Sequence, residues 1–202
     1  MEKKKNDFIA QGSILAIASI LVRVMGMIYR IPMTAIIGDK GNGFYSYAYS
    51  VYTILLLLSS YSLPLAVSKM VSAKAQLGQW RNVKRVFICA IAFAIGIGTT
   101  FGLIVLIGAQ FFTRVFFHSE LAAIALRFMA PTILIMALLG VFRGFFQGLQ
   151  NTLPTAVSQI VEGLINAIMS VVFAYFLFDF GHGMDAAGGT TDLGYAWGAA
   201  GG

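Results

Sequence analysis

The apolar run from about Phe8 to Ile37 is long enough to cross a membrane, yet it contains two arginines, Arg23 and Arg30. They are seven residues apart, or two helical turns, so they lie on one face of a helix. A charge at membrane depth costs about 2.5 to 3.5 kcal/mol on insertion scales, so such a residue faces protein or water rather than lipid. The other positions on this face are all small: Gly12, Ala16, Ser19 and Gly26. The run therefore predicts a membrane helix with one polar, functional face.

The composition indicates an all-α integral membrane protein. Hydrophobic residues make up 58% of the chain and charged residues 11%, with a mean hydropathy of +0.82. A soluble domain has about a quarter of its residues charged. The net charge of +6 does not predict nucleic-acid binding, because the lysines lie at span ends. It predicts contact with membrane lipids and a fixed orientation.

The 202 residues predict a polytopic helical bundle with five complete spans and the start of a sixth. The predicted spans are 8–37, 44–77 with a break at 59–64, 86–112, 120–148, 155–180 and 195–202. Gly-rich segments predict a turn at 37–43 and a loop at 181–193. The last apolar segment stops after eight residues. We therefore expect the chain to be one N-terminal transmembrane lobe, a fragment of a longer protein.

Lysine and arginine in the short connections predict the orientation. Most lie at the N-terminus and between the second and third spans: Lys3, Lys4, Lys5, Lys69, Lys74, Arg81, Lys84 and Arg85. The alternate side has only Lys40 and Arg114. The N-terminus is therefore predicted to be cytoplasmic.

Two further helix faces are polar. Tyr45, Tyr49 and Tyr52 recur at helical spacing; Tyr45 suits a membrane interface, whereas Tyr49 and Tyr52 suit either an interface or a cavity lining. In the fifth span, one face holds five polar residues spaced four, three, four and four apart: Thr155, Gln159, Glu162, Asn166 and Ser170. Single polar residues often join helices, but five centred on a carboxylate indicate a cavity wall.

No enzyme is predicted, since the HExxH, P-loop, CxxC and Gly-x-Ser-x-Gly patterns are all absent. His118 and His182 are 64 residues apart with no ligand cluster beside them, so neither a metal nor a cofactor is predicted. Cys89 lies inside an apolar run and is predicted to pack there.

Several arginines around a wet cleft would make an anion site, because guanidinium matches phosphate oxygens bidentately. Other interpretations stay open: Arg23 could pair with Glu162 to fix helix packing, Arg30 and Arg127 could reach the interface, and Arg143 could contact headgroups. The candidate substrate-binding residues are Arg23, Arg30, Tyr49, Tyr52, Arg143, Gln159, Glu162 and Asn166.

Four segments together resemble one family: 23–32, 63–69, 143–148 and 154–162. They are similar to polysaccharide biosynthesis proteins of the stage V sporulation protein B type. These belong to the multidrug/oligosaccharidyl-lipid/polysaccharide exporter superfamily, which includes the lipid II flippases. Arg23 matches a cavity arginine of the flippase first helix, and Arg30 stands one residue off that pattern.

The resemblance implies two pseudo-symmetric helical lobes that move lipid-linked sugar precursors by alternating access. The substrate would be a lipid-linked anion, a polyprenyl-diphosphate sugar, and the partner would be the C-terminal lobe of the same protein. A cation-coupled drug exporter is one alternative, although its first helix often carries an acid, and here only Asp7 lies near that helix. A membrane scaffold for envelope or spore-coat assembly is the other, and it would keep its arginines fully paired.

Overall fold

The computed structural model describes residues 2–60, 62–188 and 192–202, with side chains described for 12–59, 62–184 and 192–202. Within these ranges the chain is all-α, and no strand is present. The helices are α1 (Glu2–Ser60), α2 (Leu63–Gln76), α3 (Trp80–Phe117), α4 (Ala122–Gly148), α5 (Leu153–Gly188) and α6 (Leu193–Gly201).

Four helical stretches of the described chain are long and apolar enough to cross a membrane: Gly12–Gln76, Trp80–Phe117, Ala122–Gly148 and Leu153–Met184. The first has 65 residues, and at 1.5 Å per residue it is far longer than the ~30 Å of one crossing. It bends at Gly38, and the turn residue Ser62 directly precedes α2. We call residues 2–37 the first arm of α1 and residues 39–60 its second arm.

The predicted turn at 37–43 is wrong in extent, because only Gly38 leaves the helical conformation. Its φ of 63° and ψ of −174° fall in a region that is essentially restricted to glycine. One residue therefore reverses the chain, and the second arm begins at once. Close packing against α6 holds this helix start, since a Cβ on Gly41 would lie 3.2 Å from the carbonyl oxygen of Tyr195.

The loop predicted from residue 181 is also wrong, because α5 continues to Gly188. A Cβ on Gly181 would lie 2.7 Å from the Cα of Gly194. The glycines thus let α5 and α6 pack backbone to backbone, which extends the helix where composition alone suggests a loop. Of the rest of the predicted loop, residues 189–191 lie outside the described residues, and Leu193 already begins α6.

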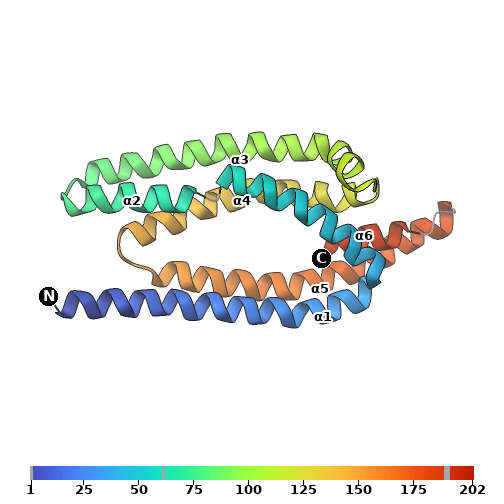
Figure 1. Cartoon of the computed structure of the whole chain (residues 1–202), viewed down its shortest axis with the longest axis horizontal. Coiled ribbons are helices and arrows are strands. Elements are labelled where there is room, and N and C mark those ends of the chain that lie inside the picture. The colour runs from blue at the N-terminus through green and yellow to red at the C-terminus, as the bar shows by residue number, and fades with distance from the viewer. Residues whose placement is uncertain (1, 61, 189–191) are drawn as a thin grey trace.

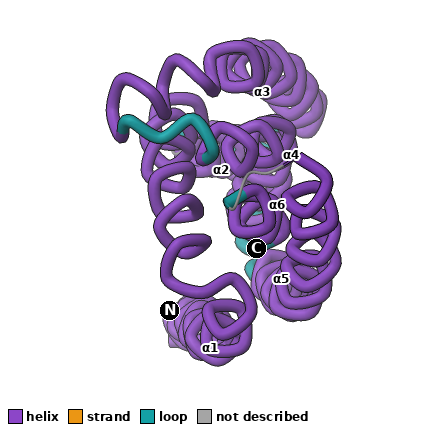
Figure 2. The backbone as a smooth tube through the Cα atoms, turned by 90° about the vertical axis from the view of Figure 1, so that its right-hand side faces the viewer, coloured by secondary structure: helices purple, strands orange, loops and turns teal. Residues whose placement is uncertain are grey.

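The helices form two groups joined by the second arm of α1. The first arm lies beside α5, while α2, α3 and α4 pack together on the other side (Figure 1). The end-on view shows the second arm connecting these groups, with α6 next to α5 (Figure 2). The N-terminus, the α2–α3 connection and the α4–α5 connection lie at one end of the molecule (Figure 1).

Three glycines of α4 allow the close approach of α2. A Cβ on Gly144 would lie 2.5 Å from the carbonyl oxygen of Pro64, and one on Gly148 would lie 2.7 Å from that of Ser68. Gly140 faces the Pro64 ring. Small residues four apart are the usual means of close helix contact in membranes. Pro64 itself is in the first turn of α2, where proline is tolerated.

Candidate functional site

The bend at Gly38 makes the two arms of α1 face each other across a hollow of about 480 Å³. We call it the arginine hollow. Arg23, Gly26 and Arg30 line it from the first arm, and Tyr45 and Tyr49 line it from the second. Both arginines are exposed, and no acidic residue lines this hollow. The small-and-cationic face of the first arm therefore borders open space.

A second hollow, of about 510 Å³, lies between the second arm, α4, α5 and the end of α6. We call it the carboxylate hollow. Tyr52, Glu162, Asn166 and Ser170 are among its lining residues. Hydroxyl, amide and carboxylate groups thus border this space, together with apolar side chains such as Met129. Since Glu162 already supplies a carboxylate, such a wall suits a neutral polar group of a ligand better than an anionic one.

Tyr45 and Tyr49 line both hollows. Their rings stack with centroids 5.7 Å apart, and Tyr49 is 6.1 Å from Tyr52. The tyrosines form a continuous aromatic ladder along the second arm. Tyr45, which the sequence assigns to a membrane interface, thus lies between the two hollows, and this position depends on the bend at Gly38.

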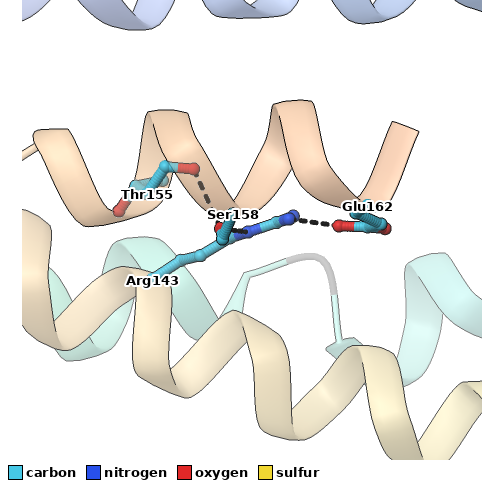
Figure 3. A network of polar contacts seen from close by, with 4 residues as sticks. All are labelled: Arg143, Thr155, Ser158 and Glu162. Carbon is cyan, nitrogen blue, oxygen red and sulfur yellow. Dashed lines mark hydrogen bonds and ion pairs between the residues drawn. The ribbon is translucent and has the colours of Figure 1, made fainter. Parts of the chain in front are cut away.

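Glu162 pairs with Arg143 of α4, and the two side chains are 40% and 18% exposed (Figure 3). Arg143 Nε also donates a hydrogen bond of 3.4 Å to Ser158 Oγ, which donates one of 2.9 Å to the Thr155 carbonyl oxygen. Arg143 lines neither hollow. It therefore neutralises Glu162 from behind the wall of the carboxylate hollow.

The pairing of Arg23 with Glu162, one of the interpretations open from the sequence, does not occur in this structure. The short α4–α5 connection places Arg143 beside Glu162. The adjacent position, Gly163, faces Val22 and Met25 of the first arm. Arg23 lies instead on the wall of the arginine hollow.

The other polar residues of the α5 stripe differ in whether they line a hollow. Asn166 lines the carboxylate hollow and accepts a 2.8 Å hydrogen bond from Ser170 Oγ. The buried Gln159 Oε1 and Thr155 Oγ1 have no hydrogen-bond partner among the described residues, and neither residue lines a hollow described above. Ser158, which contacts Arg143, lies beside the stripe and is missed by periodicity.

The two hollows differ in charge. Two guanidinium groups face the arginine hollow, and the single carboxylate of the neighbouring hollow is already paired. An anion would therefore be favoured on the arginine side and a hydroxyl-rich group on the tyrosine side. No cluster of His, Cys, Asp and Glu among the described side chains could hold a metal ion.

Residues 8–187 match a family described as polysaccharide biosynthesis protein. The lipid II flippase MurJ of Bacillus subtilis (strain 168) is 27% identical over 163 residues, covering 77% of this chain and 30% of that protein. Stage V sporulation protein B of the same organism is 26% identical over 184 residues, covering 91% and 36%. The chain thus spans about a third of the length of these curated relatives. No solved structure is significantly similar to it.

Proposed function

Because this chain belongs to the polysaccharide biosynthesis protein family, we propose that it helps to move lipid-linked sugar precursors with a polyprenyl-diphosphate carrier across the cell membrane. Its relatives of this kind include a protein named as a lipid II flippase. The two hollows would form the substrate-facing wall. Arg23 and Arg30 would contact the diphosphate, and the tyrosine ladder with Asn166 would contact the sugar.

The observation that carries this proposal is the position of Arg23 and Arg30 on one open hollow without an acid. Diphosphate carries several negative oxygens, and paired guanidinium groups bind such oxygens bidentately. A cation-coupled drug exporter would need an acidic cavity, yet the nearby Glu162 is paired with Arg143. The charge distribution therefore favours an anionic substrate over a cationic one.

Transport by alternating access requires two lobes that rock against each other around the substrate. We therefore expect this chain to transport only together with a second, C-terminal lobe, and to bind substrate through its own hollows. Binding is accordingly the activity to measure first.

The test is binding of a polyprenyl-diphosphate disaccharide to the full chain in lipid nanodiscs. Arg23→Ala should weaken binding by about tenfold or more, since a hydrogen bond to a charged group contributes roughly 1.5 to 3 kcal/mol. Arg23→Lys should also weaken it, because lysine cannot bind bidentately. Arg127→Ala is the matched control, since Arg127 is exposed and lines neither hollow. Unchanged binding by the Arg23→Ala variant would overturn the proposal.

A further inference from the structure

A third hollow, of about 630 Å³, lies at the start of α3, away from the two hollows described above. We call it the basic hollow. Its cations are Arg81, Lys84 and Arg85, which at spacings of three and four lie on one face of the helix. Asn82, Ile88 and Cys89 complete its lining. No acid contributes to it, so three positive charges surround one space.

These three cations have no ion-pair partner among the described side chains. The ion pairs found there join Lys40 to Asp192, Arg114 to Glu120 and Arg143 to Glu162. The sequence itself has no acidic residue between Asp39 and Glu120. Like charges so close together repel each other, and an anion from outside the chain would relieve that repulsion.

Below the cations, the same face of α3 becomes apolar. Ile88 and Ile95 follow at helical spacing and are 55% and 47% exposed. Val83, Ala90 and Ala94 are buried on the opposite side, in the contact with α2 and α4. One exposed face therefore runs from three cations into a strip of aliphatic side chains. A free phosphate ion would match only the upper part of this face.

Trp80, at the beginning of α3, is 63% exposed. Exposed tryptophan at a helix end is typical of the membrane–water interface, where headgroups lie. The exposed Trp80 therefore favours a position of the basic hollow at headgroup depth, with the aliphatic strip directed toward the hydrocarbon core. A cationic hollow followed by an aliphatic strip matches the anionic headgroup and the acyl chain of a phospholipid.

We propose that the basic hollow binds the phosphate of an anionic phospholipid, and that an acyl chain of the same lipid lies along Ile88 and Ile95. The site is separate from the proposed substrate hollows and does not depend on their function. Cys89 lines this hollow and is exposed, whereas its apolar sequence context predicts that it is packed. This residue, the one cysteine of the chain, supplies a native reporter.

The test follows the reaction of Cys89 with N-ethylmaleimide, which is neutral and crosses membranes, in vesicles that contain the full chain. Phosphatidylglycerol added to phosphatidylcholine should slow the reaction by occupying the hollow. The double variant Arg81→Gln, Arg85→Gln should need about fivefold more phosphatidylglycerol for each charge removed to reach the same protection. Lys69→Gln, Lys74→Gln is the matched control, because it removes two charges from α2, outside this hollow.

The outcomes distinguish a bound lipid from other causes of a slower Cys89 reaction. Equal protection of the wild type and the α2 variant, with the α3 variant protected only at higher phosphatidylglycerol content, supports the site. Equal protection in all three would reflect only the general surface potential and would overturn it, as would no protection at all. Inorganic phosphate in vesicles of pure phosphatidylcholine tests the headgroup by itself, and full protection by phosphate would contradict the contribution of the acyl chain.

Discussion

Arg143 of α4 and Glu162 of α5 form an ion pair that joins helices with little other contact between them. The first arm of α1 packs beside α5, whereas α4 packs with α2 and α3. The pair therefore links the two helix groups close to the α4–α5 connection. It also leaves the cations of the arginine hollow without an opposing carboxylate.

Loss of either member of this pair is expected to destabilise the chain. Arg143→Gln or Glu162→Gln should each cost about 1 to 3 kcal/mol of unfolding free energy, because the partner is left partly buried and uncompensated. The double variant should be less destabilised than the sum of the two. A double-mutant cycle of detergent-induced unfolding measures this coupling. Glu120→Gln is the control, since the Arg114–Glu120 pair is 75% and 70% exposed, and additive single effects at 143 and 162 would contradict the prediction.

Gly38→Ala should oppose the bend of α1. Alanine at a φ of 63° and ψ of −174° costs about 1 to 3 kcal/mol. Gly43→Ala is the control, because its Cβ would meet nothing within 4 Å and alanine favours a helix by up to about 1 kcal/mol over glycine. We expect lower thermal stability for the first variant and unchanged or higher stability for the second. Equal stability of the two would mean that the bend does not require glycine.

Gly144→Ala should separate α2 from α4. Its Cβ would lie 2.5 Å from a backbone carbonyl oxygen, and overpacking of this kind costs about 1 to 3 kcal/mol. Gly96→Ala, whose Cβ would meet nothing within 4 Å, should have little effect on the unfolding midpoint. If both variants unfolded alike, the close contact between α2 and α4 would not contribute to stability.

Water access distinguishes a substrate cavity from a scaffold with paired arginines. Single cysteines replacing Arg23, Arg30 and Glu162 in a Cys89→Ser background should react with a water-soluble thiol reagent, because all three positions line hollows. A cysteine replacing Ala174, which is fully buried, should react at least about tenfold more slowly. Protection of positions 23 and 30 to the level of position 174 would favour the scaffold.

The charge distribution predicts a cytoplasmic N-terminus, with the α2–α3 connection on the same side. An alkaline phosphatase fused after Gly183 should therefore be active, since the far end of α5 would lie outside the cytoplasm. The same reporter fused after Gly78 should be inactive. The reverse pattern would show the opposite orientation.

The sequence by itself determined properties that depend on local spacing and composition. Apolar length showed an all-α membrane protein, and helical periodicity placed Arg23 with Arg30 and Glu162 with Asn166 on common faces. These inferences succeed because hydropathy and the 3.6-residue repeat act within a single helix. Proline and serine near residue 62 predict an interruption; in the structure Ser62 is a turn residue, and Tyr61 lies outside the described residues.

Only the tertiary structure decided which of these faces meet. The conformation of Gly38 reverses α1 within one residue and puts Tyr45 between two hollows. Packing of glycines against neighbouring backbones extends α5 and draws α2 onto α4. Glu162 accordingly pairs with Arg143 and not with Arg23. Such contacts join residues far apart in the chain, and they depend on shape complementarity between helices. The periodicity within one helix carries no information about that complementarity.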